Sequence, residues 1–310
     1  MSSTEINLSQ VFTHTSDTHN TTIHWTSIGP ANAPPVIFIH GTPWSSYTWA
    51  AQALALSTRF KVYLFDRPGF GASPERQPLH LKTLDVTTEL DGSLSGQAAS
   101  FAALYTYWSF HPSQPPHVIA HDNAGLVALR AHLTHGIAYA SLCLVDVVAV
   151  PPFGAPLFRL IAQNRSVFDA VPDSVHEGIL RSYIRDASAR PLSKDVEDRL
   201  VLPWTPAGTQ GPHAFIRQLV QADQRFAADV EPRYAEVGAA MPVKVVWGLE
   251  DRWIPAERAK TLAERVAARG LVFVDGAGHL IMFDQPERLA VEIAVWLGSV
   301  AAPALGDDAR

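Results

Sequence analysis

Two carboxylates and a histidine stand directly after short apolar runs and could together carry out nucleophilic catalysis. Asp122 follows HVIAH, Asp251 follows KVVWGLE, and His279 follows LVFVDGAG. A carboxylate is already ionised at neutral pH and can attack saturated carbon without first losing a proton. A histidine oriented by a second carboxylate can then activate water against the ester that results. In chain order, the three residues therefore predict a nucleophile, an acid and a histidine.

The segment around Asp122 predicts a strand, a tight turn of small residues and a helix. It reads HVIAHDNAGLVALRAHL, residues 117–133. A turn of this kind holds the serine of G-x-S-x-G segments out over the end of a parallel sheet. Serine is suited to attack on acyl carbon and needs a base to take its proton. Aspartate at this position favours attack on an sp3 carbon bearing halide or epoxide oxygen. It disfavours an ordinary esterase, because attack on an ester would give an anhydride.

Further polar groups are expected at the same end of the sheet. In HGTPWSSYTW, residues 40–49, a glycine beside a turn proline can aim the backbone N–H of Thr42 into the site. With the N–H of Asn123 it could hold a tetrahedral oxyanion. Asp146, in LVDVVAVPP, is the alternative to Asp251 as the acid. His40 and His121 are expected to shape the oxyanion loop through hydrogen bonds.

The composition predicts a soluble, cytoplasmic protein. The chain has 310 residues, of which 47% are apolar and 17% charged, with a net charge of −6. No block of like charge points to nucleic acid or to a membrane surface, and no apolar run approaches the roughly 18 residues of a membrane span. The start, MSSTEINLSQ, lacks the features of a secretory signal. A single cysteine, Cys143, argues against disulfides, and the absence of phosphate-loop, dinucleotide or metal-ligand motifs predicts no cofactor and no metal.

Apolar runs and helical patterns alternate along the chain. Their Val/Ile/Leu character indicates a parallel sheet buried on both faces, hence a doubly wound α/β fold. Expected strands lie at residues 6–15, 21–29, 34–41, 60–66, 117–122, 141–150, 242–248 and 270–279, and expected helices at 94–110, 124–135, 256–268 and 286–299.

One interval interrupts this alternation. Residues 151–240 carry helical patterns and no convincing strand, and the strand pattern resumes at 242. We expect a core formed by residues 1–150 and 241–300, with 151–240 as a helical lid over the carboxyl ends of the strands. Residues 301–310 are predicted to be a disordered tail.

These segments resemble the α/β-hydrolase superfamily, and specifically its haloalkane dehalogenase and epoxide hydrolase branch. HGTPWSSYTW is similar to the HGxPxxxxxW stretch of that branch, DRPGFGAS to its DxxGxGxS turn, and HDNAG to its aspartate elbow. WGLEDRWIP and GAGHLIMFDQPERL resemble the acid and histidine segments. The resemblance covers roughly residues 20–300. It implies an α/β-hydrolase fold with a mostly parallel eight-stranded sheet and a helical cap inserted between strands 6 and 7.

The resemblance leaves two leaving groups open. Haloalkane dehalogenases place a Trp directly after the nucleophile, where this chain has Asn123, although Trp44 could point into the pocket. Epoxide hydrolases protonate the opening oxygen with cap tyrosines, for which Tyr183 and Tyr234 are available. Trp204 is a third aromatic residue that could line the pocket. Epoxide opening is favoured over dehalogenation. A haloacid substrate is set aside, because the expected arginines after the nucleophile are absent.

Other functions remain open beside this one. Asp122 could act as a general base in a cofactor-free lyase or isomerase, or the fold could bind a ligand without turnover. The predicted lining of Phe153, Phe158, Trp204 and Phe215 favours a small hydrophobic substrate. The sequence predicts neither the identity of that substrate nor the oligomeric state.

Overall fold

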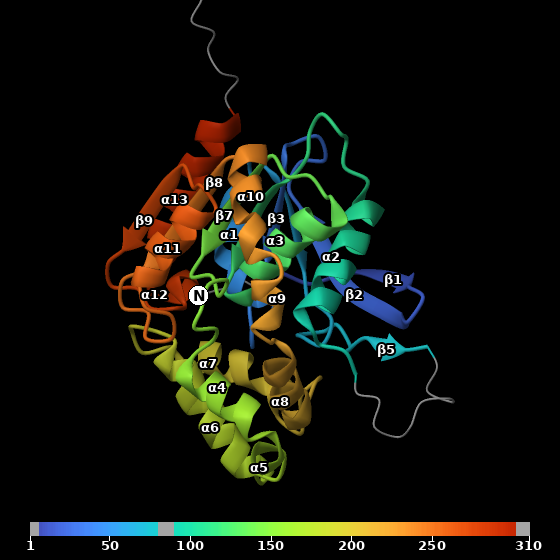
Figure 1. Ribbon diagram of the computed structural model, residues 1–310, viewed down its shortest axis with the longest axis vertical. Helices are drawn as coiled ribbons and strands as arrows, with labels where there is room; N and C mark the ends of the chain where they lie inside the picture. Colours follow the sequence, from blue (N-terminus) through green and yellow to red (C-terminus); the bar gives the residue numbers. More distant parts are fainter. Residues whose placement is uncertain (1–5, 80–89, 302–310) are drawn as a thin grey trace, which may run out of the picture.

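The computed structural model describes residues 6–79 and 90–301, and its centre is a single sheet (Figure 1). The strands follow the order β1-β2-β4-β3-β6-β7-β8-β9, and a short strand, β5, pairs with β2 beside this path. The strands are β1 Gln10–Thr15, β2 His19–Ile28, β3 Pro35–Ile39, β4 Lys61–Phe65, β5 Gln77–Pro78, β6 His117–His121, β7 Ser141–Val145, β8 Val243–Gly248 and β9 Gly270–Val274.

The sheet is antiparallel at one edge and parallel elsewhere. β1 and β2 form the antiparallel edge, and every pairing from β4 to β9 is parallel. The predicted eight strands and the α/β-hydrolase fold are therefore confirmed. The structure adds β5, which is only two residues long and leaves no periodic pattern in the sequence.

Helices cover both faces of the sheet, because alternate strand residues point to opposite sides. Ile37 and Ile39 of β3 join the core under α2 and α3, whereas Val36 and Phe38 join the core under α1 and α13. Outside the interval between β7 and β8, the helical segments are η1 Ser46–Trp49, α1 Ala50–Leu56, α2 Leu94–Trp108, α3 Asn123–His135, α11 Glu257–Arg265, α12 Ile281–Asp284 and α13 Pro286–Ala301.

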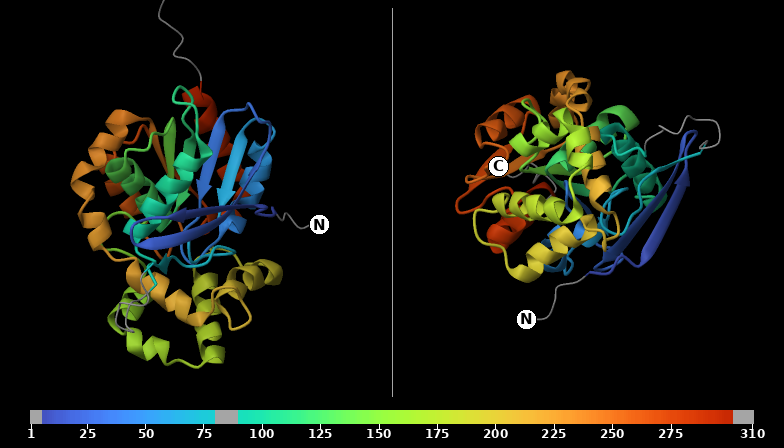
Figure 2. Two further views of the ribbon diagram at one scale, coloured as in Figure 1. Left: turned by 90° about the vertical axis from the view of Figure 1, so that its right-hand side faces the viewer. Right: turned by 90° about the horizontal axis from the view of Figure 1, so that it is seen from below.

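The chain between β7 and β8 forms helices and no strand. In Figures 1 and 2, α4 to α8 gather beyond one end of the sheet, and α10 packs against α3 of the core. The boundaries 151–240 for a separate cap stay a prediction. The segments are α4 Pro156–Gln163, α5 Arg165–Asp169, α6 Asp173–Asp186, α7 Lys194–Val201, η2 Leu202–Trp204, α8 Pro212–Gln221, α9 Arg225–Ala228, η3 Glu231–Arg233 and α10 Tyr234–Ala240.

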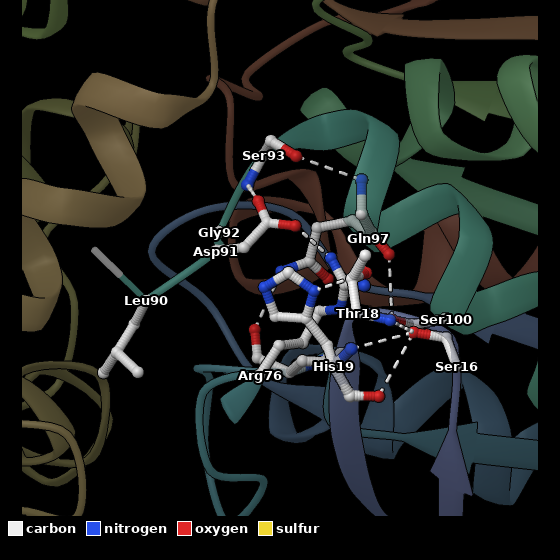
Figure 3. Close-up of polar contacts among 12 residues, drawn as sticks. Ser16, Thr18, His19, Arg76, Leu90, Asp91, Gly92, Ser93, Gln97 and Ser100 are labelled. Atoms are coloured by element: carbon white, nitrogen blue, oxygen red, sulfur yellow. Dashed lines mark hydrogen bonds and ion pairs between the residues drawn. The ribbon is translucent and has the colours of Figure 1, made fainter. Parts of the chain in front are cut away.

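Polar contacts fasten the start of α2 to the edge of the sheet (Figure 3). Ser93 caps the helix, because its Oγ accepts the backbone N–H of Gly96 at 3.1 Å. Asp91 accepts the N–H of Ser93 at 2.8 Å and pairs with Arg76, which lies next to β5. The helix that packs beside α3, and so beside the elbow, is thereby tied to the chain that precedes it.

Two further observations concern the described residues only. No helix among them is both long enough and apolar enough to cross a membrane. Cys143 is buried in β7, as its apolar surroundings predicted. The predicted tail, apart from Ala301, lies outside the described residues.

Candidate active site

Asp122 occupies a strained turn between β6 and α3. Its φ of 55° and ψ of −136° lie in a region that residues with a side chain rarely adopt. Such strain is retained where the surrounding structure over-determines it. Two glycines make room for the turn: a Cβ on Gly41 would lie 2.4 Å from the Asp122 Cβ, and one on Gly125 would lie 2.3 Å from Val147. The small residues noted around Asp122 are therefore a steric requirement of the elbow.

The two oxygens of the Asp122 carboxylate have different partners. Oδ2 accepts the backbone N–H of Thr42 at 2.7 Å, as the position of Gly41 and Pro43 predicted. Oδ1 lies 3.6 Å from Nε2 of His279 and accepts no hydrogen bond from a backbone group of the described residues. Asn123 is the first residue of α3, so its own N–H has no acceptor within the helix. One oxygen is thus held by the backbone while the other faces the histidine.

His279 lies in the loop after β9 and binds Asp251. The distance between His279 Nδ1 and Asp251 Oδ2 is 2.8 Å, and both side chains are buried. Asp251 is itself held, because its Oδ1 accepts the N–H groups of Trp253 and Ile254 at 2.8 and 2.9 Å. Three residues that are far apart in the sequence are thus brought into one row, Asp122, His279 and Asp251.

Asp146, the alternative acid, directly follows β7 and makes no hydrogen bond with His279. Its Oδ1 accepts the N–H of Gly248 at 2.9 Å, and its buried Oδ2 has no partner among the described residues. Burial and the neighbouring charge of Asp251 raise the pKa of Asp146 well above its ordinary value. His279 Nδ1 contacts Asp251 and not Asp146, so the geometry favours Asp251 as the acid.

The charges of Asp122 and His279 stabilise each other. Burial would lower the pKa of His279, but the charge of Asp251, its hydrogen bond to Nδ1 and the nearby charge of Asp122 outweigh it, and the pKa lies well above its ordinary value. Burial would likewise raise the pKa of Asp122, but chiefly the nearby charge of His279, together with that of His121 and the hydrogen bond from the Thr42 N–H, outweighs it and lowers the pKa. The resting pair is therefore a carboxylate and an imidazolium.

Of the two flanking histidines, His40 makes hydrogen bonds at the oxyanion loop as expected, whereas His121 binds the loop of His279 instead. Nε2 of His40 accepts the backbone N–H of Arg67 at 2.9 Å, and its Nδ1 lies 2.8 Å from the Gly41 oxygen. Nε2 of His121 lies 2.8 Å from the backbone oxygen of His279. These contacts fix the loop that carries Thr42 and the loop that carries His279.

A narrow, mainly apolar cavity lies above Asp122. Its volume is about 10 Å³, close to the room that one water molecule needs. The lining combines residues of the elbow and its oxyanion loop with residues from the segment after β7, from α6 and from the loop after β8. They are Thr42, Asp122, Asn123, Val148, Phe153, Gly154, Ala155, Phe158, Tyr183, Trp253 and Ile254.

The three aromatic side chains proposed for this cavity differ in position. Tyr183 lines it, and its ring stacks on Trp253 with 3.9 Å between ring centroids. Trp204 does not line it, because its indole N–H donates to the Pro43 oxygen at 2.9 Å. Trp44 also lies outside the lining and stacks on Trp253 at 5.7 Å. The second cap tyrosine, Tyr234, donates to the Ala149 oxygen at 3.0 Å.

Sequence reasoning missed three residues around this site. Trp253 follows Asp251 by two positions, and an aromatic residue so close to a predicted acid could have been noticed. Asp284 accepts the backbone N–H of Gly278, next to His279, at 2.8 Å. Arg67 is buried beside Thr42. Nothing in the local sequence signals the last two contacts, since they join separate segments. Within the described residues no group of three or more His, Cys, Asp or Glu side chains could hold a metal ion.

Comparison with known proteins gives matches over nearly the whole chain. A family model described as the alpha/beta hydrolase family matches residues 36–292. A crystal structure of an alpha/beta hydrolase fold protein from Burkholderia ambifaria is 36% identical and has a TM-score of 0.78. That match covers 93% of this chain and 97% of the other.

Weaker matches carry several different activities in their names. Pimeloyl-[acyl-carrier protein] methyl ester esterase of Vibrio campbellii is 23% identical, over 88% of this chain and 98% of that protein. Epoxide hydrolase 1 of Caenorhabditis elegans is 19% identical, over 89% and 67%. The structure of haloalkane dehalogenase DbeA from Bradyrhizobium elkani is 16% identical with a TM-score of 0.71, over 94% and 99%. At 16% identity, the likeness to the dehalogenase structure shows only that the two proteins share a fold.

Proposed function

This chain belongs to the alpha/beta hydrolase family, and on that premise we propose that it hydrolyses small hydrophobic molecules with an electrophilic sp3 carbon, epoxides foremost, through an ester on Asp122. The family alone leaves the substrate open, because its members include esterases, epoxide hydrolases and dehalogenases. The observation that carries the proposal is a carboxylate at the elbow that lines the cavity, with Oδ2 held by the Thr42 N–H and Oδ1 3.6 Å from Nε2 of His279.

In the first step Oδ1 of Asp122 attacks the substrate carbon. A bond forms between Oδ1 and that carbon while the carbon–oxygen bond of the epoxide breaks, and the electron pair stays on the departing oxygen. The Tyr183 hydroxyl supplies the proton that this oxygen takes up. This hydroxyl makes no hydrogen bond to another described residue, and its ring is held in place by Trp253. The product is a hydroxyalkyl ester of Asp122.

Alkylation prepares the second step by changing His279. Once Asp122 is an ester, its negative charge is gone, and with it one of the two carboxylates that hold the His279 pKa high. The imidazolium then passes its Nε2 proton to the Tyr183 phenolate left by the first step, and the neutral His279 becomes a base for water. Water attacks Cγ of Asp122 and passes a proton to Nε2 of His279. The oxyanion on Oδ2 is stabilised by the Thr42 N–H, with Asn123 as the second donor. Collapse breaks the bond between Cγ and the alkoxide oxygen, and the alkoxide takes the proton from Nε2. The regenerated Asp122 carboxyl group then gives its own proton to His279, which restores the resting pair.

One observation favours a second candidate, haloalkane dehalogenation by the same two steps. Trp253 lines the cavity, and its buried Nε1 has no hydrogen-bond partner among the described residues. An indole N–H of this kind could stabilise a departing halide. The Asn123 amide is less suited to that role, because its Nδ2 already donates to Oγ1 of Thr42 at 2.9 Å.

The test is the intact-protein mass of His279→Gln after incubation with styrene oxide, cyclohexene oxide, epichlorohydrin and butyl bromide. We expect the ester to accumulate, because the second step lacks its base. An adduct with the full mass of an epoxide supports epoxide opening, and an adduct lacking the halide supports dehalogenation. The variant that also carries Asp122→Asn is the matched control and must stay unlabelled.

Two outcomes would contradict the proposal. Turnover of a panel member without any adduct in His279→Gln would favour Asp122 as a general base in a lyase or isomerase. Esterase activity that survives Asp122→Ser unchanged would favour acyl chemistry instead. Tyr183→Phe separates the two leaving groups. It should slow epoxide opening on the order of a hundredfold and leave butyl bromide almost unaffected, since bromide needs no proton.

A further inference from the structure

Arg67 is a buried cation with no paired anion beside the proposed nucleophile. Its side chain is 1% exposed, and within the described residues no carboxylate forms an ion pair with it. Nη2 donates to Oγ1 of Thr42 at 3.0 Å, and the guanidinium lies 4.5 Å from the Phe70 ring centroid. Its Nε and Nη1 have no hydrogen-bond partner among the described residues. Burying a charge in this way is costly, so its retention calls for a role.

The surrounding turn holds Arg67 in place. Asp66 accepts the N–H groups of Ser46 and Ala72, both at 2.8 Å. Gly71 must be a glycine here, because its φ is 51° and a Cβ would lie 2.0 Å from an Asp66 oxygen. The backbone of Arg67 is fixed in addition by its N–H donating to His40. Its guanidinium is thus presented to Thr42 by a rigid turn.

Thr42 is the point at which this cation meets the proposed chemistry. Its Oγ1 accepts from Arg67 on one side and from the Asn123 amide on the other. Its backbone N–H binds Oδ2 of Asp122. Arg67 therefore hydrogen-bonds the side chain of one proposed oxyanion residue, and the same Thr42 oxygen accepts from the side chain of the other. It also acts electrostatically, since the charge of Asp122 is what opposes the effect of burial on Arg67, whose pKa is lowered to about 9.

We propose that Arg67 is a positioning residue that accelerates the second step, hydrolysis of the Asp122 ester, through Thr42. This inference rests on the proposed function. The two steps change the charge on Asp122 in opposite directions: alkylation removes a negative charge, and attack of water restores one on Oδ2. A fixed cation lowers the energy of the charged states. It therefore assists hydrolysis and gives no assistance to alkylation.

The experiment compares the two steps in Arg67→Gln and Arg67→Lys, using the panel member that labels His279→Gln. With His279 intact, Arg67→Gln should slow ester hydrolysis at least about tenfold, so that the ester becomes visible in the intact mass during turnover. In the His279→Gln background, the variant that also carries Arg67→Gln should form the Asp122 ester at the same rate as His279→Gln alone, or faster. Arg67→Lys should restore much of the hydrolysis rate because it keeps the charge.

Arg130→Gln is the matched control. Arg130 is also a buried arginine, but it pairs with Asp229 and contacts none of the residues proposed for the site, so its loss should leave the ratio of the two rates unchanged. Thr42→Val provides a second test should Arg67→Gln fail to fold. It removes the oxygen that links Arg67 to the loop and keeps the backbone N–H, and it should also accumulate ester.

The outcomes separate the inference from the function on which it rests. Equal slowing of labelling and hydrolysis in Arg67→Gln, or hydrolysis at the wild-type rate, would overturn the role of Arg67 and leave the Asp122 ester standing. No labelling of His279→Gln by any panel member would overturn the proposed function itself, and this inference with it.

Discussion

At the scale of single residues, the site depends on which groups are charged. Asp251 touches His279 and receives two backbone N–H groups. Asp146 lies nearby with its pKa raised well above the ordinary value, first by burial and then by the charge of Asp251. Only Asp251 hydrogen-bonds His279, and the raised pKa of Asp146 makes that carboxyl group the poorer partner for an imidazolium. The sequence favoured Asp251 and kept Asp146 as the alternative, because both residues follow a strand end.

We therefore expect the loss of Asp251 to lower kcat much more than the loss of Asp146. Asp251→Asn should lower kcat by roughly a hundredfold to ten-thousandfold, because His279 loses its anion. Asp146→Asn should lower it less than about tenfold, since Asp146 makes no hydrogen bond with His279 and the amide keeps the shape and an acceptor oxygen for the Gly248 N–H. Steady-state kinetics of both variants on one substrate is the measurement. A larger loss in Asp146→Asn would show that Asp146 is the acid.

At the scale of elements, the loop of His279 and the end of α6 are joined by one buried carboxylate. Asp284 of α12 accepts the N–H groups of Ala189, Arg190 and Gly278 at 2.8, 3.0 and 2.8 Å, and the Ser188 hydroxyl also donates to it. Because α6 carries Tyr183, this carboxylate fixes the proposed acid of the first step relative to the proposed base of the second.

Asp284→Asn should destabilise the protein by about 2–3 kcal/mol, because the amide nitrogen would face donors and leave at least one of them without an acceptor. It should also lower kcat, since the loop of His279 is no longer fixed to α6. Asp275→Asn is the control from the same segment, because Asp275 is exposed. Urea denaturation of both variants measures the difference. Equal stability would mean that the Asp284 hydrogen bonds contribute nothing net.

The elements that carry the chemistry were predictable, and the contacts between them were not. Asp122, Asp251 and His279 each follow an apolar run, so their meeting at one sheet end follows from the parallel order of the strands. Arg67 and Thr42, or Asp284 and Ser188, lie in segments whose relative positions are set by packing. Trp204 illustrates the same limit: its type suggested a pocket residue, but the fold turns its N–H to the Pro43 oxygen.

At the scale of the whole molecule, buried histidines make stability depend on pH. Burial lowers the pKa of His117 to about 4 and that of His121 to about 3, with the charge of His279 contributing to the latter. In the unfolded chain these groups take up protons near pH 6.5. As the pH falls below 6.5, these histidines bind protons in the unfolded state but not in the folded state. The free energy of unfolding therefore decreases until the pH reaches the pKa that each histidine has in the folded protein.

His117→Gln should therefore reduce the acid sensitivity of the fold. Between pH 6.5 and 4, we expect the wild type to lose on the order of 3 kcal/mol more of its unfolding free energy than the variant, from a pKa lowered by about 2.5. His111→Gln is the control, because His111 is exposed. Chemical denaturation across this range tests the prediction, and parallel curves for wild type and His117→Gln would refute it.

The central claim is that Asp122 forms a covalent ester, and a single turnover in heavy-oxygen water tests it most directly. The enzyme in excess is mixed with the substrate that labels His279→Gln, and both the product and the peptide containing Asp122 are analysed by mass spectrometry. If Oδ1 attacks carbon, the first product carries the original carboxylate oxygen, and 18O appears in Asp122. Finding 18O in the first product and none in Asp122 would show that water attacks the substrate directly, and the covalent mechanism would be wrong.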